Sequence, residues 1–276
     1  MRKLNFTLLL IFLITSACNF SLDSSSAFNK EVATRAAIAL TGTAENKQNQ
    51  VPYTETTIPS TITPKMGKSP ETSTPTASTD DPKLTLGEPT WKDTLSSGNS
   101  FGLDPDGIAI DSTVIKVKNG KLVMFRGIAS GGKTWWLAYP QPKNFYLEAK
   151  FETSTCSGND QYGLAFRAIN YEDGYAYYFI ITCDGHYSLL KQTTNGSSWL
   201  FDWQISDEIH KGSNQTNILG VWAKEKNIKL YVNNKLLKEL DDTSLPNEGH
   251  FGPLIDARET AGFTIKMDEI TYWKLP

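Results

Sequence analysis

The chain has few of the residues that build metal and redox sites. Its 276 residues include three cysteines, none in a CxxC pair, and three scattered histidines, His186, His210 and His250. This pattern argues against a zinc-type metal centre. An excess of positive charge is also lacking, because the net charge is -3, the isoelectric point is near 5.7 and no concentrated basic patch is present. Binding to nucleic acid needs such a patch, so we expect no nucleic acid partner.

A long apolar run is missing as well. The apolar residues 6–14 fall far below the roughly 20 that a membrane-spanning helix needs. They follow Arg2 and Lys3 and precede the small residues Thr15, Ser16 and Ala17, a layout that predicts a secretory signal peptide over residues 1–17. We therefore expect an exported protein.

Cys18, directly after Ala17, resembles the modified cysteine in the lipobox of bacterial lipoproteins. The resemblance implies that Cys18 is lipidated, becomes the mature N-terminus and anchors the chain in the membrane at the bacterial cell surface. Thr15 stands where that motif usually has leucine. Ordinary signal cleavage and an uncleaved anchor are the alternatives.

Residues 18–85 are expected to form a stalk. Within residues 52–82 about three in five are Ser, Thr or Pro, a composition that buries too little apolar surface to offset chain entropy. We predict an extended, disordered spacer between the anchor and the folded part.

Composition changes near Leu86, and all seven tryptophans follow it. Apolar residues then fall into short alternating runs separated by turn residues, which predicts an all-β sandwich over residues 86–276. In residues 145–152, alternation places Phe145, Leu147, Ala149 and Phe151 toward a core and the intervening charged residues toward water. Asn233 and Asn234 are expected to form a two-residue hairpin turn.

Cys156 and Cys183 remain as one possible pair in an oxidising compartment once Cys18 carries lipid. They end the strands that begin near residues 145 and 175. In an up-and-down meander these strands would run the same way and end at one edge of a sheet, so we predict a disulfide. Two free buried thiols are the alternative.

A family resemblance is carried by a series of short motifs. In order they are DQYGLAFR at 160–167, YYFI at 177–180, DGHY at 184–187, NILGVW at 217–222, IKLYVN at 228–233 and IKMD at 265–268. The series resembles the concanavalin A-like lectin/glucanase superfamily, with its laminin G-like and 3-keto-disaccharide hydrolase-like members. The resemblance implies a two-sheet antiparallel jelly-roll sandwich with one concave face where sugars commonly bind.

Two residues are candidates for that concave face. Arg167 alternates with Tyr162, Leu164 and Phe166, so it is expected to point out of the core and to offer a hydrogen-bonding fork to a sugar. An exposed charge paired with a neighbouring acid is the alternative for Arg167. Tyr178 is expected on the outward face of its strand by the same alternation.

Tryptophans are the other candidates, because aromatic faces suit the apolar faces of sugar rings. Trp135 and Trp136 are adjacent and should point to opposite faces, so one of them is expected to be partly exposed, and Trp136 is taken as a binding candidate. Trp199 follows the turn Asn195-Gly196 and is the better candidate for exposure. Burial in the core is the alternative for each, and for Trp222 it is the expectation.

The family's glycoside hydrolases of family 16 carry a Glu-x-Asp-x-Glu strand, and this sequence has none. We therefore expect a non-catalytic, monomeric module that binds carbohydrate or a cell-surface glycan, with no cofactor and no metal. A glycosidic-bond hydrolase and a protein-adhesion module are the alternatives. Structural calcium also stays open, with Asp104 and Asp106, or Asp173 and Asp184, as ligands, although Asp and Gly are more often turn residues.

Overall fold

A computed structural model describes residues 80–276. The predicted signal peptide at residues 1–17, the lipidation site Cys18 and the stalk up to residue 79 lie outside the described residues. The short helix α2 (Lys83–Leu86) spans the predicted domain boundary at Leu86 and is tied to the fold, since the Lys83 ammonium lies 2.8 Å from a Glu148 carboxylate oxygen.

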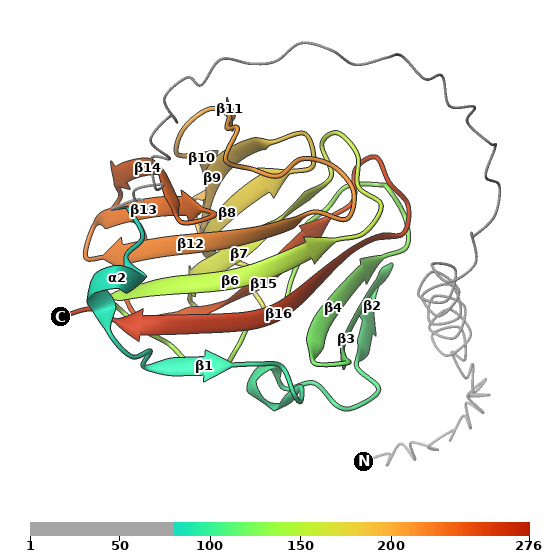
Figure 1. The fold of residues 1–276 in the computed structure, drawn as a ribbon, viewed down its shortest axis with the longest axis horizontal. Helices are drawn as coiled ribbons and strands as arrows, with labels where there is room; N and C mark the ends of the chain where they lie inside the picture. Colours follow the sequence, from blue (N-terminus) through green and yellow to red (C-terminus); the bar gives the residue numbers. More distant parts are fainter. Residues whose placement is uncertain (1–79) are drawn as a thin grey trace, which may run out of the picture.

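Two antiparallel sheets form the fold, as predicted (Figure 1). The first sheet has nine strands; β1 pairs with β16, and the other eight follow in spatial order: β14 (Lys235–Asp241), β13 (Asn227–Val232), β12 (Thr216–Lys224), β6 (Phe145–Thr153), β16 (Phe263–Lys274), β4 (Lys121–Arg126), β3 (Thr113–Lys118) and β2 (Ile108–Ile110). Strand β1 spans Trp91–Asp93.

The second sheet has seven strands and lies behind β12, β6 and β16 in Figure 1. Strand β11 (Gln204–Ile205) pairs with β9, and the others are, in order, β10 (Gly196–Trp199), β9 (His186–Thr193), β8 (Ala176–Thr182), β7 (Gln161–Ala168), β15 (His250–Asp256) and β5 (Thr134–Trp135). Strand β2 lies at one end of the nine-stranded order and β5 at one end of the seven-stranded order, opposite β14 and β10 respectively. The 3-10 turn η1 (Asn99–Phe101) precedes β2.

The main core lies between the sheets and follows the predicted alternation. Phe145, Leu147, Ala149 and Phe151 of β6 are buried in it, while Lys150 on the same strand is exposed. Asn233 and Asn234 both have positive φ angles, which the predicted hairpin turn requires. Period two therefore describes the regular strands well.

A disulfide joins Cys156 and Cys183, whose Cα atoms lie 5.8 Å apart. The strand arrangement used to predict it is wrong, however. Strand β6, which precedes Cys156, belongs to the nine-stranded sheet, and β8, which precedes Cys183, belongs to the seven-stranded sheet. The disulfide thus links the ends of the two sheets and not two strands of one meander.

The outward position predicted for Arg167 is wrong. A β-bulge interrupts the pairing of β7 with β15 beside it, and Arg167 has a φ of 51°. The bulge breaks the two-residue period. Arg167 is 1% exposed, and its guanidinium donates hydrogen bonds to the carbonyls of Leu245 and Lys143 at 3.2 and 3.3 Å.

Trp222 also departs from its predicted core position. It is partly buried against Tyr146, Tyr231 and Trp273, a cluster separate from the main core. On β12 it alternates with Val221 and Ala223, which do belong to the main core, so Trp222 lies on the outer face of the nine-stranded sheet.

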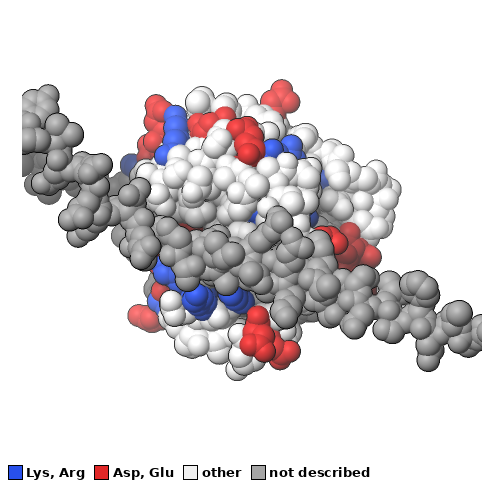
Figure 2. All heavy atoms as spheres, turned by 90° about the vertical axis from the view of Figure 1, so that its right-hand side faces the viewer, with Lys and Arg blue, Asp and Glu red and all other residues white. Residues whose placement is uncertain are grey.

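The surface carries charges of both signs. On the face shown in Figure 2, acidic and basic side chains both appear, and uncharged atoms occupy much of the area between them. Within residues 80–276, no helix has the length and apolar character needed to cross a membrane.

Candidate functional site

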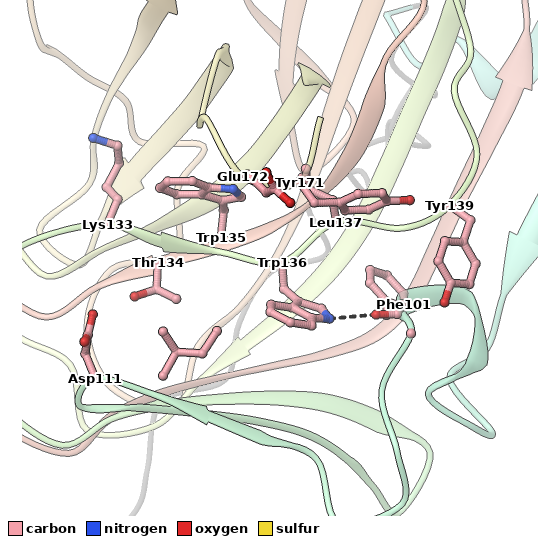
Figure 3. A pocket seen from close by; sticks show the side chains of 12 residues that line it. Phe101, Asp111, Lys133, Thr134, Trp135, Trp136, Leu137, Tyr139, Tyr171 and Glu172 are labelled. Atoms are coloured by element: carbon pink, nitrogen blue, oxygen red, sulfur yellow. Dashed lines mark hydrogen bonds between the residues drawn. The ribbon is translucent and has the colours of Figure 1, made fainter. Parts of the chain in front are cut away.

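A pocket of about 480 Å³ opens where the edge strands β2 and β5 approach each other. Its walls come from η1, the end of β2, the segment from Lys133 to Tyr139, and the turn between β7 and β8. Five aromatic residues line it: Phe101, Trp135, Trp136, Tyr139 and Tyr171 (Figure 3). Segments far apart in the sequence thus build one aromatic cavity.

Trp135 and Trp136 pack against different clusters, as alternation along a strand predicts. Trp136 packs against the main core, and its indole N–H donates a 2.8 Å hydrogen bond to the Phe101 carbonyl. The Trp135 ring meets Tyr178 edge to face, with centroids 5.9 Å apart. Both rings still line the pocket, so they form two fixed walls.

Two glycines give the aromatic rings room. Gly174 has a φ of 68°, and a Cβ placed there would lie 2.8 Å from the Trp135 ring. Gly102 has a φ of 61°, and a Cβ there would lie 2.6 Å from the Tyr139 hydroxyl. Only glycine suits both the left-handed backbone and the close approach at these positions.

Tyr139 and Tyr171 form the open side of the pocket. They are 56% and 46% exposed, and their rings meet edge to face at 6.4 Å. The Tyr171 ring also lies 4.2 Å from the ring of His250, which hydrogen-bonds to the Ala138 carbonyl at 2.9 Å and to Gln141 at 2.8 Å. Burial and, to a smaller extent, Tyr139 raise the pKa of the Tyr171 phenol.

Three charged residues line the same pocket. Asp111, with a φ of 50°, follows β2, and Glu172 follows Tyr171 in the turn between β7 and β8. Lys133 precedes β5, and its ammonium lies 5.4 Å from the centroid of the Tyr178 ring. Burial lowers the pKa of Lys133, and the nearby Asp256 carboxylate opposes that effect.

The residues predicted for a ligand site do not come together. Trp136 lines the pocket. Trp199 is exposed, as expected, but lies at the far edge of the seven-stranded sheet on β10, with its ring 4.9 Å from that of Trp203. Tyr178 does lie outside the main core, yet it is fully buried under Trp135, and its hydroxyl donates to the Gly174 carbonyl at 2.6 Å.

Most of the pocket residues were not among the predicted candidates. Tyr139 lies three residues after Trp136, and Tyr171 and Glu172 lie in the polar segment 170–174 between β7 and β8. A tyrosine inside a strong turn signal is a usable hint, because a turn places its side chains at the surface. No sequence pattern predicts that Phe101 and Asp111 line the pocket, because their positions there depend on how η1 and β2 pack beside β5.

The two glutamates of β6, Glu148 and Glu152, form ion pairs with lysines. Glu152 lies 2.8 Å from Lys121 and 2.7 Å from Lys266, and hydrogen bonds from these two lysines lower the pKa of its carboxyl group. Glu148 pairs with Lys83. Both acids face outward from the nine-stranded sheet, as predicted, and are ion-paired there.

Two of the aspartates considered for calcium, Asp173 and Asp184, hydrogen-bond to neighbouring residues. Asp173 accepts a 2.7 Å hydrogen bond from Asn170, and Asp184 contacts the Thr182 hydroxyl and His186. Across residues 80–276 no cluster of three or more His, Cys, Asp or Glu side chains is arranged to hold a metal ion.

Comparison with known proteins gives similarity to solved structures alone. No family model matches the chain, and no curated protein matches it. The carbohydrate-binding module CBM66 from Bacillus subtilis is 16% identical, with a TM-score of 0.44 over 68% of this chain and 98% of that one. The catalytic domain of an endo-1,3-beta-glucanase (laminarinase) from Thermotoga petrophila is 10% identical, with a TM-score of 0.46 over 68% and 97%.

A family 16 endo-glucanase from Bacteroides ovatus is 8% identical, with a TM-score of 0.45 over 66% of this chain and 99% of that chain. At these identities and TM-scores the similarity assigns neither a family nor an activity. The two-sheet antiparallel sandwich is established by the strand pairing itself.

Proposed function

We propose that the β-sandwich is a carbohydrate-binding module and that the pocket beside β5 is its binding site. The observation that carries the proposal is the lining of this pocket by five aromatic side chains with charged groups among them. Sugar rings have apolar C–H faces that pack on aromatic rings and hydroxyls that need polar partners. A mostly apolar cavity with a few polar groups supplies both.

The rigidity of the pocket supports binding. Trp136 is held by its hydrogen bond to Phe101, and Trp135 packs on the buried Tyr178. These rings therefore need little ordering when a ligand enters, which keeps the entropic cost of binding low. Tyr139 and Tyr171, both substantially exposed, would close over the ligand from the open side.

The proposal is tested with a glycan array probed by the full-length chain purified in detergent. Tyr139→Ala and Tyr171→Ala remove exposed rings from the pocket, and Trp199→Ala removes an exposed ring from the opposite edge of the same sheet. We expect the two tyrosine variants to lose binding to a defined saccharide and the Trp199 variant to keep it. Loss in the Trp199 variant alone would move the site to β10, and no binding to any glycan would contradict the proposed function.

Hydrolysis is the second candidate, because Asp111 and Glu172 place two carboxylates on one pocket. A glycosidase needs such a pair as acid and base or nucleophile. Release of reducing sugar by the wild type that is abolished in Glu172→Gln would favour this candidate over binding alone.

We propose also that the chain is exported and attached to the bacterial membrane through lipid on Cys18. The support is the N-terminal layout of positive, apolar and small residues before this cysteine. Incorporation of labelled fatty acid into the wild type, and its loss in Cys18→Ser, is the expected result. Equal labelling of both would contradict it.

A further inference from the structure

Two acidic side chains at the pocket lack a cationic partner. Asp111 and Glu172 line the cavity from different segments, and neither forms an ion pair with any residue of the described range 80–276. Other acidic groups of the fold do have a cationic partner. Asp256 pairs with Arg258 at 3.0 Å, and Asp242 pairs with Lys191 at 3.0 Å.

The lysine of the pocket does not neutralise these acids. Figure 3 shows the Lys133 side chain directed away from Asp111 and from Glu172. Its ammonium lies over the ring of Tyr178, and the carboxylate that acts on its pKa is Asp256 of β15. Lys133 therefore lines the pocket without forming an ion pair with Asp111 or Glu172.

A second cation, Arg126, lies behind that wall. It is 7% exposed, and its guanidinium donates to the hydroxyls of Thr113 and Thr134, both at 3.0 Å, and to the Gly131 carbonyl at 2.8 Å. Thr134, which accepts a hydrogen bond from this guanidinium, lines the pocket, whereas Arg126 itself does not. Of the three charged residues that line the cavity, Asp111 and Glu172 are thus the two carboxylates, and within residues 80–276 neither has an ion-pair partner.

Aromatic rings add to this preference for positive charge. The face of Trp, Tyr or Phe attracts a cation within about 6 Å of the ring centroid, and the attraction increases when water is excluded. Here five aromatic residues and two unpaired carboxylates surround one cavity. A neutral sugar would pack on the rings and donate hydroxyl hydrogen bonds to the carboxylates, whereas a sugar with a positive substituent would in addition gain charge attraction to both.

We propose that the pocket selects carbohydrate bearing a protonated amino group, that is, a hexosamine without its N-acetyl group. This inference rests on the proposed function, because it names the class of sugar for the same site. The amino group is placed among the aromatic faces and is attracted to Asp111 and Glu172. Acetylation removes the charge and so removes this attraction.

The test compares three β-1,4-linked tetrasaccharides that differ only at C2: those of glucosamine, N-acetylglucosamine and glucose. Binding to the full-length chain in detergent is measured by titration calorimetry near pH 6. The glucosamine tetramer should bind about tenfold more tightly than the other two, and the preference should decrease as salt is raised. Glu172→Gln and Asp111→Asn should each weaken its binding by about threefold, as expected for exposed charge pairs.

The matched control is Glu208→Gln, which removes an exposed carboxylate outside the pocket and should leave all three affinities unchanged. Thermal unfolding of each variant checks that the fold is kept. Equal binding of the charged and neutral tetramers, lost in Tyr171→Ala, would overturn the preference for an amino group while supporting carbohydrate binding. If a glycan array with neutral, acidic and amino sugars shows no binding at all, the proposed function itself is wrong.

Discussion

Gly252→Ala tests how the sandwich holds the pocket in place. Gly252 lies on β15, beside the segment that carries Trp136. A Cβ at this position would overlap the Trp136 carbonyl oxygen and lie 3.0 Å from the Trp136 carbonyl carbon and from the Leu137 Cα. These are backbone atoms, so the segment itself would have to move.

The movement would strain two hydrogen bonds on either side of Gly252. Trp136 N–H donates to the Pro253 carbonyl at 3.0 Å, and Ala138 N–H donates to the Phe251 carbonyl at 2.8 Å. Each such bond is worth about 1 kcal/mol, and overpacking adds about 1 to 3 kcal/mol. We expect the free energy of unfolding to fall by about 3 kcal/mol, which lowers Tm by roughly 10 °C in a domain of this size.

Scanning calorimetry measures the shift, and Gly127→Ala is the control because a Cβ there would make only ordinary contacts at 3.5 Å. Gly252→Ala should also weaken glycan binding, because Trp136 moves with the displaced segment. An unfolding temperature within about 2 °C of the wild type would correspond to a loss of less than about 1 kcal/mol and would mean that the 136–138 segment accommodates the added Cβ without strain.

Two further predictions concern buried charge. Burial alone would raise the pKa of Asp242, but hydrogen bonds from Tyr177, Ser244 and Lys191 outweigh it and lower the pKa to about 2, below the usual 3.8. A lowered folded-state pKa gives stability that is present above about pH 4 and is lost as pH falls through about 2. Asp242→Asn should therefore lower the free energy of unfolding by about 1 to 2 kcal/mol at pH 7 and by almost nothing at pH 2, as measured by urea unfolding at both pH values. A loss of stability that does not depend on pH would contradict this prediction. Arg167→Met should cost about 2 to 3 kcal/mol of unfolding free energy, because the carbonyls of Leu245 and Lys143 lose their donor. The Arg167→Met variant should keep the glycan affinity of the wild type, since Arg167 is buried and does not line the pocket. A loss of affinity without a loss of stability would indicate that Arg167 contacts the ligand.

The strands were predictable where the backbone is regular. Alternation on β6 gives the correct faces for Phe145 and Phe151, and the Asn233-Asn234 turn follows from the tolerance of asparagine for positive φ. Arg167 was placed on the wrong side because a bulge interrupts the pairing of β7 with β15. No local sequence pattern marked that extra residue.

The site was harder to predict than the fold. Trp136, a predicted ligand-binding candidate, lines the pocket, but the neighbouring residues Tyr139, Tyr171 and Phe101 come from a connection, a turn and a 3-10 segment. Their proximity depends on β2 and β5 being the edge strands on the same side of the two sheets. That arrangement is a property of the whole topology, which periodicity and turn signals do not determine.

The decisive experiment is a crystal structure of the full-length chain with the glycan that binds best on the array. We expect a sugar ring against Trp136, enclosed by Tyr139 and Tyr171, in the pocket between β2 and β5. A sugar bound at Trp199 and Trp203 instead, with this pocket empty, would show that the binding site is not this pocket.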